Sequence, residues 1–149
     1  MGSFYNSIEV SATGLSAERL AMDVIANNLA NVNTTRTPEG GPFKRQLIVF
    51  AQKQDPGTDG TNPLDPSSAT SSRAGVQALG IVPDTGPDKL VYDPQHPDAD
   101  TNGYVHYPNI DVVKEMVDMM SASRAYEANV TAIQESRSMG NTILGLLKA

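Results

Sequence analysis

The residues best suited to metal chemistry are the run DADTNG at 98–103. Aspartate, asparagine and glycine at these spacings match the first half of an EF-hand loop, whose oxygen atoms bind Ca²⁺ around a glycine turn. The twelfth position of such a loop requires a bidentate glutamate, but here it is Asn109. An EF-hand loop also joins two helices, whereas prolines precede this run and a strand-like sequence follows it. We therefore favour a polar hairpin turn at Asn102 and Gly103, and Ca²⁺ binding is the weaker alternative.

A second set of possible metal ligands comprises Asp93, His96, Asp98 and His106. No spacing rule places these side chains on one rigid element. The chain has two histidines and no cysteine, which excludes a thiol nucleophile and leaves few candidates for general-base catalysis. The motifs typical of serine hydrolases, P-loop proteins and zinc metalloproteases are absent. We expect no catalytic site, no metal site and no cofactor.

Composition excludes other classes of function. The 149 residues allow one domain of ordinary size or two small layers. A net charge of −6 and a pI near 4.7 argue against binding to nucleic acid. No apolar run is long enough to predict a membrane-spanning helix. The first residues, MGSFYNSIEV, lack the pattern of a cleavable secretory signal, so none is expected.

The chain has three parts of different composition. Residues 51–109 hold eight of the ten prolines and eight of the 17 acidic residues. Apolar residues at helical spacing dominate on either side. We predict an N-terminal helix within 1–33, an extended, β-rich middle segment at 34–109 and a C-terminal helix within 110–149. Within the middle segment, the Pro, Gly, Ser, Thr and Asp content of about 55–74 predicts a mobile loop.

Four short runs in the middle segment are rich in β-branched and aromatic residues and predict strands. They are Gln46–Ala51, Val76–Val82, Lys89–Tyr92 and Tyr104–Tyr107. The fold class is thus mainly α with a small β-rich insert, and we expect the two terminal helices to pair as an antiparallel coiled coil.

Both predicted helices carry apolar residues on more than one side. In the first, the residues at 8, 15, 22 and 29 repeat every seven positions, and a second apolar stripe lies beside them. In the second, Asp111 is a plausible N-cap, and a line with 4-3 spacing follows from Val112. Pairing of two helices covers only part of such surfaces, and the remainder predicts a partner interface. The competing interpretation is that the middle segment folds back over them.

Two segments resemble the terminal signatures of bacterial flagellar rod and hook proteins. The first reads SATGL at 11–15 and MDVIANNLANVNT at 22–34, and the second reads MMSASRAYEAN at 119–129. The proximal type of basal-body rod protein is also suggested by TTRTPEGGPF at 34–43, HPDAD at 96–100 and GYV at 103–105. The middle segment is too short for hook and distal-rod relatives.

This resemblance implies a structural axial subunit of the flagellar basal-body rod, and no enzyme. Members of the family leave the cell through the flagellar type III export apparatus without a cleaved signal peptide. They assemble in the periplasm with copies of themselves, other rod proteins and neighbouring ring or adaptor proteins. The resulting helical tube transmits motor torque and encloses the export channel.

We expect the residues that contact neighbouring subunits to lie on the apolar and asparagine-rich faces of both helices. They are Ile8, Leu15, Met22, Ile25, Asn27, Asn28, Leu29, Asn31, Met116, Met119, Arg124, Tyr126, Val130, Ile133, Leu144 and Leu147. The alternative function is a soluble coiled-coil adaptor or export chaperone, whose exposed helices would bind one client protein.

Overall fold

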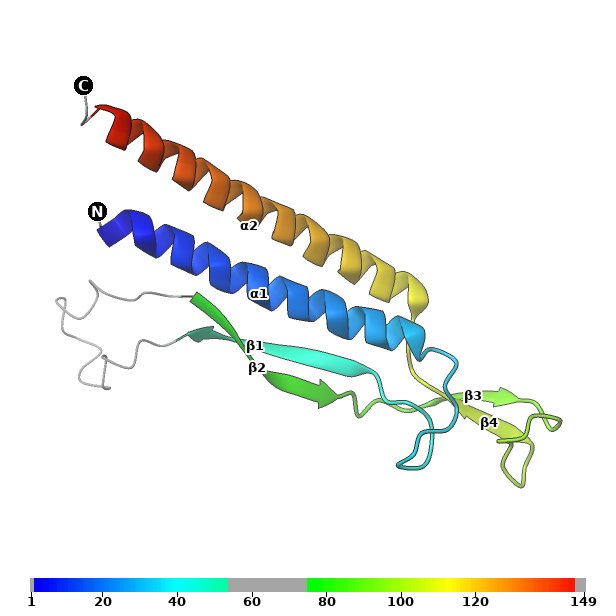
Figure 1. The fold of residues 1–149 in the computed structure, drawn as a ribbon. Coiled ribbons are helices and arrows are strands. Elements are labelled where there is room, and N and C mark those ends of the chain that lie inside the picture. Colours follow the sequence, from blue (N-terminus) through cyan, green and yellow to red (C-terminus); the bar gives the residue numbers. More distant parts are fainter. Residues whose placement is uncertain (1, 54–74, 147–149) are drawn as a thin grey trace, which may run out of the picture. The chain divides into compact units, whose positions relative to one another are not determined.

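Along the chain, a long helix comes first, four short strands follow it, and a second long helix comes last (Figure 1). The computed structural model describes residues 2–53 and 75–146. The helices are α1 (Gly2–Ala30) and α2 (Val112–Leu146). The strands are β1 (Gln46–Lys53), β2 (Gly75–Pro83), β3 (Lys89–Tyr92) and β4 (Tyr104–Tyr107). The expected terminal helices and small β region are confirmed, whereas the loop predicted at about 55–74 lies outside the described residues.

Side chains at the helix ends explain where the helices start and stop. Asp111 Oδ1 accepts hydrogen bonds from the N–H groups of Val113 (3.0 Å) and Lys114 (3.4 Å), so the predicted N-cap of α2 is confirmed. At the end of α1, Asn31 Nδ2 donates to the carbonyl oxygen of Asn27 (2.9 Å). That carbonyl also accepts the backbone N–H of Asn31 (3.1 Å), so the side chain adds a second hydrogen bond at the last turn of the helix.

The strands form two separate two-stranded sheets, β1 with β2 and β3 with β4. β3 and β4 are antiparallel, with Val91 opposite Val105 and Tyr92 opposite Tyr104. Neighbouring side chains on a strand point to opposite faces, so Val105 and Tyr104 lie on different faces of this ribbon. Val105 is fully buried, whereas Tyr92 and Tyr104 are exposed and their rings meet edge-on at 5.3 Å. Only one face of the ribbon therefore contributes to a core.

The turn before β4 differs from the predicted hairpin. Residues 93–103 connect β3 to β4, so Asn102 and Gly103 do not form a two-residue hairpin loop. Gly103 does adopt the predicted positive φ, at 81°, and its N–H donates to the Asp100 carbonyl (3.0 Å). The Asp100 carboxylate closes the turn by accepting the N–H groups of Asn102 (2.8 Å) and Tyr104 (2.9 Å). The Asp100 side chain thus adds two hydrogen bonds to the backbone turn bond between Gly103 and Asp100.

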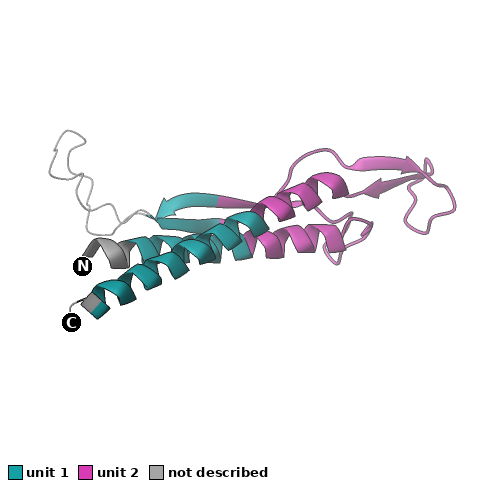
Figure 2. Ribbon diagram, turned by 90° about the horizontal axis from the view of Figure 1, so that it is seen from above, with its two compact units in different colours: residues 1–19, 50–79, 123–149 teal, residues 20–49, 80–122 magenta. Residues whose placement is uncertain are grey.

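The chain divides into two compact units, each containing part of both helices and of β1 and β2 (Figure 2). Unit 1 consists of residues 1–19, 50–79 and 123–149. Unit 2 consists of residues 20–49 and 80–122, and it also contains β3 and β4.

In unit 1, the start of β2 is fixed to α1 through one hydroxyl group. The N–H of Val76 donates to Thr13 Oγ1 (3.1 Å), and the same hydroxyl donates to the Val10 carbonyl (2.7 Å). A methyl group added at Gly75 would lie only 2.7 Å from Thr13 Oγ1. Since both bonds hold that hydroxyl in place, the approach of β2 requires glycine at this position.

The buried apolar residues of the described chain are few and mostly small. They are Ala17 in unit 1 and Ala21, Val24, Val105, Pro108 and Ala122 in unit 2. Gly14 of α1 is so close to α2 that an added Cβ would lie 3.0 Å from Asn129 Nδ2. Small side chains let two helices approach closely, and the larger apolar residues are then left outside the contact.

We predict that Gly75→Ala separates the start of β2 from α1. The added methyl group overlaps a hydroxyl that cannot turn away without losing two hydrogen bonds, so the free energy of unfolding should fall by about 1–3 kcal/mol. Gly80→Ala is the matched control in the same strand, because nothing lies within 4 Å of its added methyl group. Urea unfolding followed by circular dichroism compares the two variants, and equal losses of stability would contradict this account of β2.

Candidate functional site: the assembly surface

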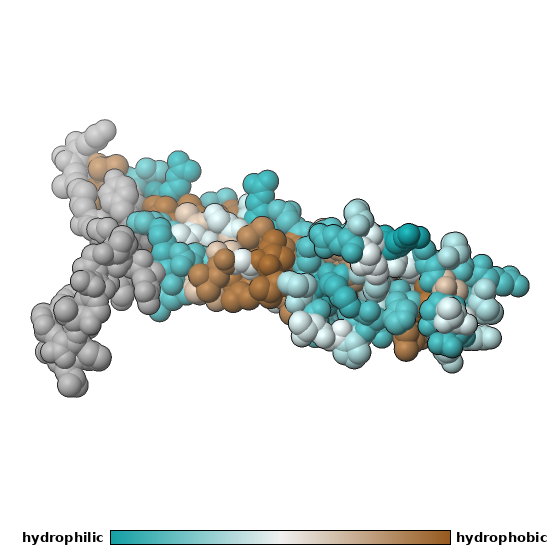
Figure 3. Space-filling model, turned by 90° about the horizontal axis from the view of Figure 1, so that it is seen from below, coloured by the Kyte–Doolittle hydropathy of each residue, from teal (hydrophilic) through white to brown (hydrophobic). Residues whose placement is uncertain are grey.

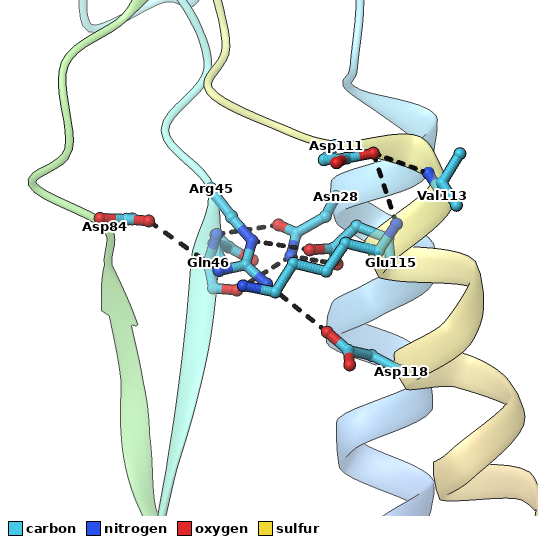
Figure 4. A network of polar contacts seen from close by, with 9 residues as sticks. Asn28, Arg45, Gln46, Asp84, Asp111, Val113, Glu115 and Asp118 are labelled. Carbon is cyan, nitrogen blue, oxygen red and sulfur yellow. Dashed lines mark hydrogen bonds and ion pairs between the residues drawn. The ribbon is translucent and has the colours of Figure 1, made fainter.

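Two charged side chains and one amide meet inside unit 2 (Figure 4). Glu115, in the first turn of α2, is 1% exposed, and its Oε1 accepts a hydrogen bond from Arg45 Nε at 2.6 Å. Its other oxygen accepts a bond from Asn28 Nδ2 (3.1 Å) on the last turn of α1. Asn28 is also 1% exposed. We call Asn28, Arg45 and Glu115 the junction cluster, because they join three segments that are far apart in the sequence.

Asn28 binds the first residue of β1 as a neighbouring strand would. Its Oδ1 accepts the N–H of Gln46 (2.8 Å), and its Nδ2 also donates to the Gln46 carbonyl (2.9 Å). Asn27 adds a bond from its Nδ2 to Gln46 Oε1 (2.9 Å). The end of α1 is therefore fixed to the start of β1 through side-chain amides, which carry both a donor and an acceptor.

Arg45 faces two carboxylates besides Glu115. Its Nη1 lies 3.9 Å from Asp84 Oδ2, and its Nη2 lies 3.8 Å from Asp118 Oδ2. The planar guanidinium presents donors in several directions, so Arg45, which directly precedes β1, can contact both α2 and the segment after β2. A buried carboxylate such as Glu115 is tolerated only when it is paired and hydrogen-bonded in this way.

The opposite side of α2 in unit 2 is apolar and exposed. We call Val113, Met116, Val117 and Met120 the apolar stripe, and each is between 53% and 71% exposed. At about 100° per residue, these four side chains lie on one side of the helix, and Glu115 and Ala122 lie on the other. This part of α2 therefore buries a charge and exposes its apolar residues, the reverse of an ordinary surface helix.

Other apolar side chains are exposed in both units. Met139, Ile143 and Leu144 lie near the end of α2 in unit 1. In unit 2, Ile81 and Val82 of β2 are exposed, and Figure 3 shows apolar surface over the strands. Patches of this kind mark sites of protein–protein contact.

The structure distributes the predicted interface residues among three environments. Met116, Arg124, Leu144 and Asn27 are exposed. The half-buried residues are Ile8, Leu15, Met22, Ile25, Leu29, Asn31, Met119, Tyr126, Val130 and Ile133. Leu147 lies outside the described residues. Asn28 requires a correction: we expected it at the interface between subunits, but its amide is buried and bonded within the chain.

Sequence reasoning missed Arg45, Gln46 and Glu115 as members of a site. Glu115 follows an N-cap, where an acidic residue is ordinary, and Arg45 stands beside a predicted strand among polar residues. One signal was present in the spacing, since Glu115, Ala122, Asn129 and Ser136 recur every seven residues. That line, and not the one with the larger residues, is the buried side of α2 at Glu115, Ala122 and Ser136.

In the run DADTNG at 98–103, which matches half of an EF-hand loop, the carboxylates of Asp98 and Asp100 bond other groups of the chain. Asp98 Oδ2 accepts a hydrogen bond from Thr35 Oγ1 (2.8 Å), and its Oδ1 lies 3.8 Å from Arg36 Nη1. The backbone N–H of Tyr104 lowers the pKa of Asp100 below its ordinary value of 3.8. Within residues 2–53 and 75–146, no three His, Cys, Asp or Glu side chains form a group that could hold a metal ion. These contacts support the interpretation of the run as a polar turn.

Comparison with known proteins matches both ends of the chain. Residues 8–36 match the family described as "Flagella basal body rod protein", and residues 101–146 match "Flagellar basal body rod FlgEFG protein C-terminal". The flagellar basal-body rod protein FlgC of Borreliella burgdorferi is 50% identical over 97% of this chain and 97% of its own length. The FlgC protein of Bacillus subtilis is 41% identical over 91% of this chain and 92% of its own length. That of Salmonella typhimurium is 37% identical over 90% of both chains.

We predict that Glu115→Ala destabilises the chain by about 1–3 kcal/mol, because it removes the carboxylate bonded to Arg45 Nε and one of the three hydrogen bonds of the buried Asn28 amide. Glu127→Ala removes an exposed carboxylate from the same helix and should change stability by no more than about 0.5 kcal/mol. Urea unfolding followed by circular dichroism measures both. Indistinguishable unfolding midpoints would show that the junction cluster does not hold unit 2 together.

Asp100→Asn tests the charge of the turn as a function of pH. Because the pKa of Asp100 is lower in the folded chain, its ionised form stabilises the turn at pH values above the ordinary 3.8. That stabilisation is lost as the pH falls through the folded-state pKa. The wild-type chain should therefore exceed the variant in stability at neutral pH, and the difference should shrink to nothing in strong acid. Urea unfolding between pH 7 and pH 2 measures this difference. A difference that is independent of pH would contradict the stabilising role of the ionised Asp100 carboxylate.

Proposed function

The chain belongs to the FlgC family of flagellar basal-body rod proteins and is a structural subunit of that rod, and we propose that the apolar stripe of α2 binds neighbouring rod subunits. The inverted burial of α2 carries this proposal. A helix that buries Glu115 and exposes Val113, Met116, Val117 and Met120 has placed its apolar side where a partner can cover it.

Covering the stripe supplies enough free energy to matter for assembly. Full burial of a valine or methionine side chain contributes about 1.5–3 kcal/mol. Four such side chains that are roughly half exposed would contribute about 3–6 kcal/mol per contact before the costs of association. The two methionines are flexible, so this surface can adapt to neighbours of slightly different shape.

The proposed contacts involve two different surfaces of the chain. One is the stripe on α2, and the other comprises the half-buried apolar residues predicted on α1, among them Ile8, Leu15, Met22, Ile25 and Leu29. A contact between unlike surfaces continues from copy to copy and forms a helical assembly, whereas a self-complementary surface closes as a dimer. The tube formed in this way would transmit torque and enclose the export channel.

Within one chain, we propose that α1 and α2 pair as an antiparallel coiled coil. Two contacts support this. Gly14 lies against Asn129 in unit 1, and Asn28 bonds Glu115 in unit 2. Gly14 and Asn28 are two heptads apart on α1, and Asn129 and Glu115 are two heptads apart on α2 in the opposite order. An antiparallel pair with heptad spacing has this relation.

As a member of this family, the chain is located in the flagellar basal body and assembles with other rod proteins. We further propose that its part of the rod crosses the periplasm, where ring or adaptor proteins contact it, and that the flagellar export apparatus delivers it there without cleaving a signal peptide. Its role is structural and not enzymatic. Neither of the described helices is long and apolar enough to span a membrane.

Met120→Asp and Ser121→Asp form a matched pair for the assembly test. Both residues are exposed on α2, but about 100° of rotation separates them, so only Met120 belongs to the stripe. In a motile host whose own copy of the gene has been replaced, the Met120 variant should be exported but should leave few or no rods. The Ser121 variant should swim normally.

The readouts are swimming on soft agar and the yield of isolated basal bodies, with circular dichroism to confirm the helix content. Normal rods with Met120→Asp would rule out the stripe as an assembly surface. If rods were normal while binding to one soluble partner was lost, the stripe would be a surface for that partner and not for assembly.

A further inference from the structure

We infer that one exposed face of the β3–β4 ribbon binds a positively charged, arginine-containing segment of a different protein. This surface lies within unit 2 and is separate from the apolar stripe of α2, so it adds a second kind of partner to the proposed function. We call it the ribbon face, and its side chains are those of Leu90, Tyr92, Tyr104 and His106.

The pairing of the two strands places these four side chains together. Leu90 lies opposite His106. Two residues further along β3, Tyr92 lies opposite Tyr104. Alternate residues of a strand share a face, so all four side chains are on one side of the ribbon and Val105 is on the other. Val105 is fully buried, whereas Leu90 and Tyr92 are 57% and 65% exposed. The ribbon therefore buries one face within the chain and exposes an aromatic and apolar face to solvent.

The ring of Tyr92 is held by its neighbours although most of it is exposed. It meets the ring of Tyr104 edge-on at 5.3 Å, with 65° between the two planes. A Cβ added at Gly103 would lie 3.0 Å from Tyr92 Cε2, so the ring also lies against the backbone of that glycine. A tyrosine side chain has few rotatable bonds, and one already in contact with its neighbours loses little conformational entropy when a partner binds. Exposed tyrosines of this kind often dominate the free energy of protein–protein binding.

The charges around the ribbon face favour a cationic partner. Residues 84–111 contain six aspartates and one lysine, and the lysine begins β3 on its other face. Two of these aspartates, Asp93 and Asp100, are exposed beside the tyrosine pair in the chain. Asp93 directly follows Tyr92, and the Asp100 carboxylate accepts the N–H of Tyr104 at 2.9 Å. That hydrogen bond lowers the pKa of Asp100, so its carboxylate is ionised at neutral pH.

Arginine matches both properties of this surface. Its planar guanidinium stacks on aromatic rings, is attracted by their π electrons and bonds a carboxylate through two donors at once. A lysine would supply the charge without the planar contact. A nucleic acid or an acidic lipid surface would be repelled by the aspartates. The chemistry of the ribbon face therefore fits a basic segment of a protein.

A second copy of this chain is a poor source of such a segment. Lys44 and Arg45 are the only two basic residues that are adjacent in the sequence, and both are paired within the chain. Lys44 Nζ lies 2.5 Å from Asp88 Oδ1. Arg45 Nε lies 2.6 Å from Glu115 Oε1. Contact between the ribbon faces of two copies would also bring like charges together, so the partner is a different protein.

Photo-cross-linking in the assembled rod tests this contact. Tyr92 is replaced by p-benzoylphenylalanine, which keeps an aromatic ring at the exposed position and reacts on irradiation with groups that touch it. The variant chain is produced alongside the wild-type chain, so that rods form even where the variant enters them poorly. After irradiation, basal bodies are isolated, and mass spectrometry identifies the protein and the residues that are joined to the variant. The same replacement of Lys89, on the other face of β3, is the matched control.

The cross-linker at Tyr92 should join a segment of a different protein that contains arginine and has a net positive charge. The control at Lys89 should give about fivefold less of that product, or none, because its side chain leaves the opposite face. If the Tyr92 variant does not enter the rod, the cross-linker is placed at Leu90, on the same face.

Substitution of Asp93 in the cross-linking chain tests the contribution of charge. Asp93→Asn keeps an acceptor for the N–H of Gln95 and removes only the charge, so the product should fall about twofold. Asp93→Lys replaces attraction by repulsion, and the product should fall about fivefold or more. Circular dichroism of each purified variant checks that it folds.

Three outcomes would overturn the assignment of the ribbon face. The first is a product with a neutral or acidic segment, or a yield that the Asp93 variants leave unchanged. The second is a product only with a copy of this chain. The third is no product from Tyr92 or Leu90 in rods that contain the variant chain, because the ribbon face would then have no partner. None of these results bears on the apolar stripe, which the Met120 and Ser121 variants test separately.

Discussion

The pairing of Arg45 with Glu115 is the interaction on which unit 2 depends. The apolar core of this unit is thin: two alanines, two valines and Pro108 are buried in its described part. The ion pair and the Asn28 amide provide directed bonds at the point where these three segments meet. A buried charge pair adds little net stability over an apolar replacement, but it permits only one arrangement. We propose that the main contribution of the pair to this chain is the specificity of that arrangement.

That arrangement determines what the chain presents to other molecules. When alanine, glycine and a satisfied polar cluster form the inner contact, the larger apolar side chains remain outside it. Val113, Met116, Val117 and Met120 are exposed because the opposite side of α2 is already occupied by Glu115 and Ala122. The folded chain therefore leaves an apolar surface of α2 exposed to solvent. We propose that neighbouring subunits cover these exposed side chains in the rod.

The sequence predicts the elements well because their signals are local. Helical spacing predicts α1 and α2, β-branched and aromatic runs predict β3 and β4 to the residue, and Asp111 caps α2 as its residue type suggests. The junction cluster could not be predicted, because its members lie at 28, 45 and 115, and only the folded chain brings them together. The same limit explains why Asn28 was assigned to subunit contacts: an asparagine at a helix end has the same local sequence whether its partner is β1 or another chain.

Heptad spacing alone does not identify the buried side of α1. Ile8, Leu15, Met22 and Leu29 repeat every seven residues and suggest a seam, yet Ala17, Ala21 and Val24 are the buried apolar residues of α1. Spacing identifies candidate stripes, but it does not tell which one faces the chain itself and which one faces a neighbour. Close approach of α1 and α2 at Gly14 favours the stripe with the smallest side chains, and that preference is visible only in three dimensions.

Shielding of the junction from solvent has a consequence for the ionic conditions that the chain tolerates. Dissolved salt weakens charge pairs at a surface, because counterions gather around each partner, but it reaches a buried pair poorly. The side chains of Arg45 and Glu115 are 15% and 1% exposed, whereas those of Lys53 and Glu9, which pair in unit 1, are 49% and 58% exposed. A high salt concentration would therefore weaken the Lys53–Glu9 pair and leave the Arg45–Glu115 pair nearly unchanged. The junction cluster should therefore hold its three segments together at both low and high salt concentrations.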